Sequence, residues 1–99
     1  MDKRELFDEV LLRVCEVTGM ERGDVLRSNR EECTDARYLL IRALGKLGLT
    51  DGETAALTGK TRQAVGYMRT RYKKTGKWTL ENDWKKVSKW IENKYFTGK

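Results

Sequence analysis

The sequence contains no proline and no histidine, and it lacks long apolar runs. No stretch approaches the roughly 18 apolar residues that a membrane-spanning helix requires, so we expect no membrane association. The charged amino-terminal residues Met1–Glu5 do not include the apolar segment of a signal peptide. We therefore expect a protein that stays in the cytoplasm.

Cysteine is scarce, and its pattern argues against metal binding. The two cysteines, Cys15 and Cys33, lie far apart, and no histidine accompanies them. Structural zinc sites cluster cysteine and histidine at short spacings, so we expect neither a metal nor a cofactor. We interpret both cysteines as small apolar residues, since free cysteine is often buried. A disulfide between them is the alternative, although cytosolic chains usually keep their thiols reduced.

The signals of an enzyme are also missing. The sequence has no histidine, no cluster of metal ligands and no phosphate-cradling loop. Its acidic residues are scattered among basic ones, in the manner of solvated helix surfaces. We therefore expect a binding protein and no enzyme.

Positive charge is present, and it is concentrated in one segment. Residues 1–59 carry nine Lys/Arg and twelve Asp/Glu, a net charge of −3. Residues 60–79 carry seven bases and no acid, a net charge of +7, and residues 80–99 carry five bases and three acids. A concentrated basic segment is typical of proteins that bind polyanions. A solvated helix face without a ligand is the alternative.

The spacing of apolar residues predicts an all-α fold that forms a single small domain over residues 1–99. Helix boundaries follow from glycines and from caps, among them a capping box of Thr50 and Glu53. We expect Leu40, Leu44 and Val65 to be buried. The predicted helices cover about residues 3–18, 21–26, 32–47, 50–58, 61–74 and 80–95.

Residues 50–74 have the spacing of a helix-turn-helix. Ala55 is small where the two helices would cross, and Gly59 suits a turn that needs a positive φ. Val65 and Met68 would then pack the second helix against the first. A bundle for protein interactions with a tight helical corner has the same spacing, and it is the alternative.

The second helix of this motif would present polar and basic side chains outward. The first residues of a recognition helix reach base edges in the major groove, where Arg and Gln pair with guanine and adenine. The residues that we expect to read bases are Thr61, Arg62, Gln63 and Gly66. The residues that we expect at the DNA backbone or in the minor groove are Arg27, Arg30, Lys60, Arg69, Thr70, Lys73 and Lys74.

Two segments within residues 11–74 resemble the C-terminal DNA-binding domain of the bacterial replication initiator DnaA, in the Trp-repressor-like superfamily. Residues 26–30, Leu-Arg-Ser-Asn-Arg, followed by Ala36 and Arg37, resemble the family's basic loop and the start of its long helix. Residues 57–65, Leu-Thr-Gly-Lys-Thr-Arg-Gln-Ala-Val, lie over the family's signature Phe-Gly-Gly-Arg-Asp-His-Thr-Thr-Val.

The resemblance implies that Arg30 reaches into the minor groove from the basic loop. It also implies that Thr61, Arg62 and Gln63 take the positions of the base-reading Asp-His-Thr. Because that triplet is replaced, the DNA target should differ from the family's own. The family's ATPase region has no counterpart here, so a complete initiator is not expected.

The last predicted helix, about residues 80–95, is strongly amphipathic. Three lysines, Lys85, Lys86 and Lys89, lie opposite an apolar arc. That arc consists of Leu80, Trp84, Val87, Trp90, Ile91 and Tyr95. We expect it to dock on the domain's own core, because a small domain needs the buried area. A homodimer interface is one alternative, and a helix that binds a membrane surface or a partner is another.

The sequence as a whole predicts a protein that binds double-stranded DNA in a sequence-specific manner. Its role would be that of a small transcriptional regulator, or of an accessory protein in replication or in a mobile element. The competing hypothesis is a protein–protein interaction module whose basic face binds an acidic partner.

Overall fold

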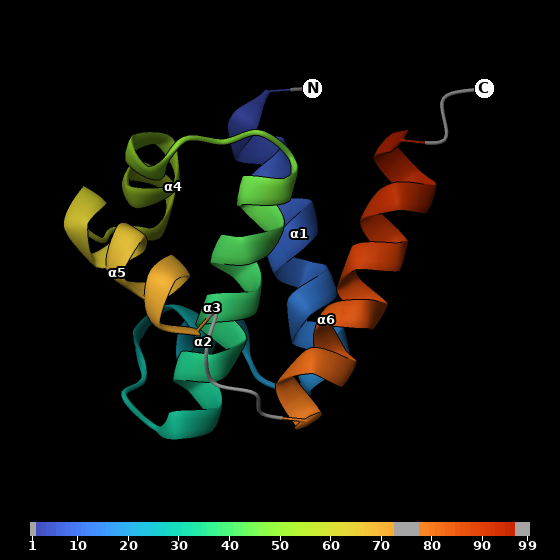
Figure 1. Ribbon diagram of the computed structural model, residues 1–99, viewed down its shortest axis with the longest axis horizontal. Coiled ribbons are helices and arrows are strands. Elements are labelled where there is room, and N and C mark those ends of the chain that lie inside the picture. Colours follow the sequence, from blue (N-terminus) through green and yellow to red (C-terminus); the bar gives the residue numbers. More distant parts are fainter. Residues whose placement is uncertain (1, 73–77, 97–99) are drawn as a thin grey trace.

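A computed structural model describes residues 2–72 and 78–96, and in this part of the chain every regular element is helical. The predicted all-α fold is confirmed (Figure 1). The elements are α1 (Lys3–Thr18), α2 (Arg22–Arg27), α3 (Glu31–Lys46), α4 (Asp51–Thr58), α5 (Arg62–Tyr72), α6 (Trp78–Ile91) and a short π-helical extension, η1 (Glu92–Phe96).

The helix boundaries follow from local capping chemistry. The Thr50 side chain accepts a hydrogen bond from the Glu53 N–H, and the Glu53 side chain accepts one from the Thr50 N–H, so the predicted capping box is present. Asp2 and Glu5 form a second capping box at the start of α1. At the end of α4, Gly59 adopts a left-handed conformation with a φ of 72°, where a side chain would be strained.

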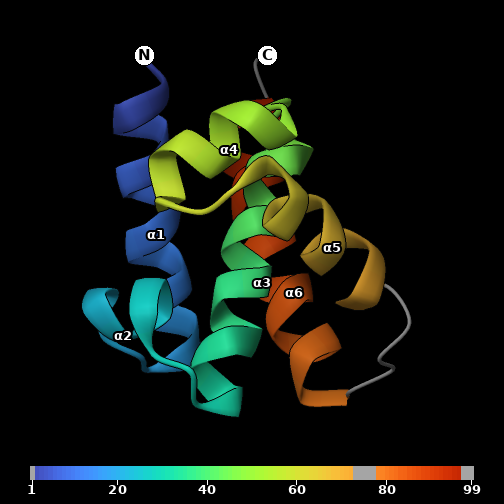
Figure 2. The same cartoon turned by 90° about the vertical axis from the view of Figure 1, so that its left-hand side faces the viewer.

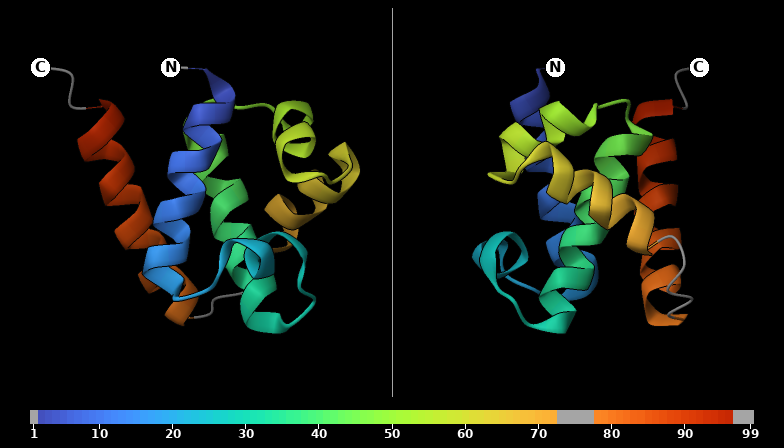
Figure 3. Two further views of the ribbon diagram at one scale, coloured as in Figure 1. Left: turned by 180° about the vertical axis from the view of Figure 1, so that it is seen from behind. Right: turned by 60° about the vertical axis from the view of Figure 1, so that its left-hand side comes forward.

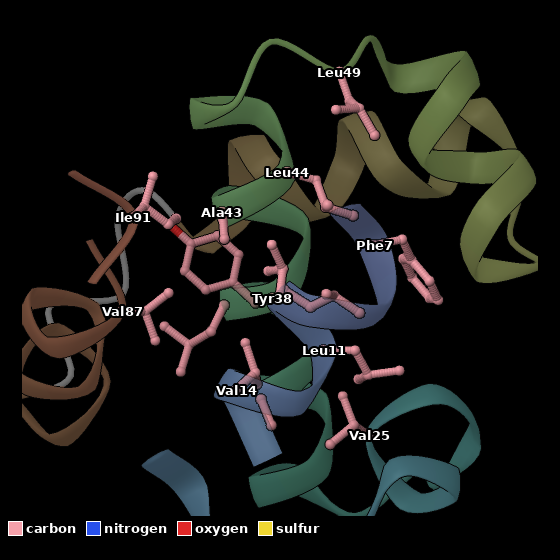
Figure 4. Packing of buried hydrophobic residues seen from close by; sticks show 14 of the residues in the cluster. Phe7, Leu11, Val14, Val25, Tyr38, Ala43, Leu44, Leu49, Val87 and Ile91 are labelled. Carbon is pink, nitrogen blue, oxygen red and sulfur yellow. The ribbon is translucent and has the colours of Figure 1, made fainter. Parts of the chain in front are cut away.

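The long helix α3 lies in the middle of the molecule. It packs against α1 and α6 on one side, α4 and α5 contact it from the other side, and the short α2 lies beside its first turns (Figures 1 and 3). Leu40 and Leu44 are fully buried on α3, as expected from the sequence. They belong to a cluster that includes Phe7 and Leu11 of α1 (Figure 4). Burying this cluster is the main source of stability for the fold.

The C-terminal helix α6 docks on the core of its own chain, which confirms the expectation. Val87 and Ile91 are completely buried against α1 and α3 (Figure 4). On the same side, the Arg42 guanidinium lies 4.2 Å from the ring centre of Trp84. The helix begins at Trp78, two residues before the predicted start, and η1 replaces its predicted last turn.

A smaller apolar cluster joins α4 and α5 to α3. It contains Ile41, Ala55 and Val65, with Met68 packed at its edge. The predicted packing of Val65 and Met68 against the helix that carries Ala55 is confirmed. One face of α5 is therefore fixed against α3 and α4 where α5 crosses α3 (Figure 2).

The two cysteines form no disulfide with each other. Both Cys15 and Cys33 are free, and Cys33 is buried. Burial also raises the pKa of the Cys15 thiol.

Within residues 2–72 and 78–96, no helix has the length and apolar character needed to span a membrane.

Candidate nucleic-acid interface

The connection between α4 and α5 is three residues long and tightly held. The N–H groups of Gly59 and Lys60 both donate to the Ala55 carbonyl. The next residue, Thr61, caps α5, since its hydroxyl accepts a hydrogen bond of 3.0 Å from the Ala64 N–H. The first turn of α5 is therefore fixed relative to the end of α4.

The outer face of α5 starts with exposed polar side chains. Thr61, Arg62 and Gln63 are all exposed, whereas Val65 is fully buried on the opposite face. Helix α5 carries no acidic residue in its first turn. The predicted base-reading residues at the start of this helix thus lie together on the surface.

Gly66 and Thr70 contribute less to the candidate interface than their positions in the sequence indicate. Gly66 has no side chain, and a Cβ added there would lie 3.5 Å from the Asp51 carboxylate, so this position faces α4 and offers no group that could read a base. The Thr70 hydroxyl donates to the Gly66 carbonyl at 3.0 Å. Thr70 is exposed and keeps its oxygen lone pairs for other donors.

Tyr67 was missed by the sequence analysis. Its side chain is 61% exposed and lies one turn after Gln63 on the same helix. The signal was available, since residues four apart share a helix face and Gln63 had already been assigned to the outer one. Tyr67 therefore joins the candidate interface.

Arg69 had been assigned to the DNA backbone, but its guanidinium points into the protein. It pairs with the Asp51 carboxylate of α4 and donates to the Ile41 carbonyl at 3.1 Å and to the Thr54 hydroxyl at 3.3 Å. Helix register explains the difference, because Arg69 lies four residues after the buried Val65. Arg69 holds α5 in place and leaves the candidate interface.

Arg62 and Lys60 lie at the junction of the two helices. The Arg62 guanidinium lies over Gly52, where an added Cβ would come within 3.0 Å of it. Lys60 is half-buried. Burial lowers the pKa of the Lys60 ammonium, and the nearby charge of Arg37 lowers it further.

The loop between α2 and α3 is held by Arg37. This buried side chain donates to the Val25 carbonyl at 2.7 Å and to the Ser28 carbonyl at 2.6 Å. Arg27 and Arg30 flank this anchored loop and are exposed. The loop that resembles the family's basic loop is therefore held in place by a side chain of α3.

Arg30 has acidic neighbours that the sequence analysis did not anticipate. Its guanidinium lies 3.4 Å from the Asp24 carboxylate and 3.7 Å from that of Glu32. These ion pairs are exposed and weak, so DNA could replace them. The assignment of Arg30 to the minor groove stays a prediction. Lys73 and Lys74, also assigned to the backbone, lie outside the described residues.

In the part of the chain that the structure describes, His, Cys, Asp and Glu side chains form no group that could hold a metal ion.

Comparisons with protein-family models, with characterised proteins and with solved structures find no match to this chain.

Proposed function

We propose that this protein binds double-stranded DNA in a sequence-specific manner, with α4 and α5 as a helix-turn-helix and α5 as the recognition helix. The observation that carries the proposal is the orientation of α5. Its inner face is fixed by Val65 and Arg69, while its first turn presents exposed Arg62 and Gln63 beside a tight glycine turn. A rigid helix start with such side chains suits the major groove.

The exposed residues divide into two groups by their chemistry. Arg62 and Gln63 can pair in bidentate fashion with guanine and adenine, and the Tyr67 ring can contact a thymine methyl group. Lys60 and Arg27 suit phosphates, which position the protein without reading sequence. The proposed specificity therefore resides in the first two turns of α5.

The resemblance to the C-terminal domain of DnaA adds support, since it covers the α2–α3 loop and the start of α5. The net charge of +6 favours a polyanionic partner. The role that we propose is that of a small transcriptional regulator or of an accessory protein in replication or in a mobile element. The proposed role is binding, not catalysis.

Selection from a random duplex pool at physiological salt tests the proposal. We expect the wild-type chain to enrich one motif, and the double variant R62A/Q63A to enrich none. A matched control, Lys89→Ala, removes an exposed cation from α6 and should leave the motif unchanged. If the wild-type chain enriches no motif, the proposal is wrong and an acidic protein partner becomes the better hypothesis.

A further inference from the structure

A groove separates the amino-terminal helices from the end of α4. It has a volume of about 450 Å³, and α1, α2, the last residues of α4 and the turn before α5 all contribute to its lining. Four cationic side chains line it, namely those of Arg4, Arg22, Arg27 and Lys60, and no described carboxylate does. We call it the α1–α4 groove.

We propose that the α1–α4 groove is a clamp for backbone phosphates of the same duplex that receives α5. The inference rests on the proposed function and extends it, because it assigns Arg4 and Arg22 to the DNA interface. Guanidinium groups suit this task, since their planar array of donors matches the oxygens of a phosphodiester.

The position of the groove relative to α5 connects it with the same DNA. Gly59 and Lys60 line the groove, and they directly precede Thr61, which caps the recognition helix. In Figure 2 the end of α4 lies between α1 and the start of α5. A duplex whose major groove admits the first turn of α5 must therefore pass one of its backbones close to Lys60.

The cations in the groove have few counter-charges. Arg27 and Lys60 form no ion pair with any residue that the structure describes, and Arg4 contacts the ring of Phe7 at 5.5 Å. The exception is Arg22, which pairs with Asp8 at 3.0 Å in an exposed ion pair. The buried Arg37 adds positive charge behind Lys60 and lowers its pKa. A phosphate bound here would offset this repulsion.

The clamp also accounts for a feature of the charge distribution. Residues 1–59 carry a net charge of −3, yet folding brings three of their arginines to one groove beside the basic segment. Most of their acids lie elsewhere or are paired, as Glu53 is with Lys3. The local field at the groove is thus positive, although the segment as a whole is acidic.

The test measures duplex affinity against salt for the full chain, with a duplex that carries the selected motif. Arg4→Gln and Arg22→Gln should each reduce the salt slope by about 0.9, which corresponds to about five-fold weaker binding at physiological salt. Ethylation interference should locate the phosphates concerned on one flank of the motif, and each variant should lose part of that pattern. The matched control, Lys85→Gln on α6, should behave as the wild type.

A variant that should bind the duplex more tightly serves as a control, because misfolding can lower the affinity but cannot raise it. Asp8→Asn removes the carboxylate that pairs with Arg22, so it should strengthen duplex binding. Millimolar inorganic phosphate, added at constant ionic strength, should displace no duplex. Displacement would instead indicate a site for a small anion and would overturn the clamp.

The two proposals fail in different ways. If Q63A weakens binding but R4Q and R22Q behave as Lys85→Gln does, the helix-turn-helix stands and the clamp is wrong. If the wild-type chain binds no duplex, the proposed function itself is wrong, and the proposed clamp is wrong as well.

Discussion

The guanidinium of Arg69 on α5 pairs with the carboxylate of Asp51 in the first turn of α4. The same guanidinium also donates to the Ile41 carbonyl of α3, so one side chain connects three helices. Among them is the helix whose outer face we propose to read DNA. The orientation of that face thus depends on a polar contact as well as on the packing of Val65.

Removing this connection should destabilise the fold. We expect Arg69→Ala to lower the free energy of unfolding by about 1–3 kcal/mol, since it removes charged hydrogen bonds that are partly exposed. Denaturant melts measure the change. The matched control Arg62→Ala, which removes an exposed arginine from the same helix, should change stability by less than about 0.5 kcal/mol. Equal effects of the two variants would mean that the internal contacts of Arg69 contribute nothing.

The docking of α6 gives a second prediction. Ile91 is completely buried, so Ile91→Ala should cost about 2–5 kcal/mol through lost burial and a cavity. Lys89→Ala, on the exposed face of the same helix, is the control. Denaturant melts measure the change. If Ile91→Ala unfolds with the same free energy as the wild type, the docking of α6 on the core is wrong.

The capping box at the start of α4 predicts a dependence on pH. Hydrogen bonds from the Lys3 ammonium and the Thr50 N–H hold the pKa of the Glu53 carboxyl below its ordinary value of 4.5. Because this pKa is lowered on folding, the stabilisation is complete above the ordinary value and is lost as the pH falls through the lowered one.

Thermal melts from about pH 6 to about pH 3 test this dependence by comparing the wild type with Glu53→Gln. Glutamine can still complete a capping box but carries no titrating charge, so the melting temperature of the variant should fall less steeply. Parallel curves would show that Glu53 makes no contribution to acid sensitivity.

Much of the fold could be predicted from the sequence because its signals are local. The apolar period placed α1 at its observed residues, and the hydroxyl of Thr50 with Glu53 marked the start of α4. Gly59 likewise marked the turn, since only glycine adopts its φ at low cost. Each of these features depends on residues within one or two turns of one another.

The candidate site was harder to predict, because the predictions that were wrong or missing involve contacts between residues far apart in the sequence. Arg69 faces Asp51, eighteen positions earlier, and a count of charges along the chain cannot distinguish that partner from solvent. The α1–α4 groove was missed for the same reason, since Arg4 and Lys60 meet only after folding. The exposed start of α5 was found because helix periodicity alone determines its inner and outer faces.

The most direct test of the account is a titration of Gln63→Ala against the selected duplex and a scrambled duplex of the same length. Gln63 is exposed at the start of α5, where a base contact forms only on the preferred site. We predict a loss of about 1–3 kcal/mol on the selected duplex and almost none on the scrambled one. Lys60→Ala, as the control for backbone contacts, should weaken both duplexes equally. If Gln63→Ala also weakens both duplexes equally, or neither, then α5 does not read bases and the central claim is wrong.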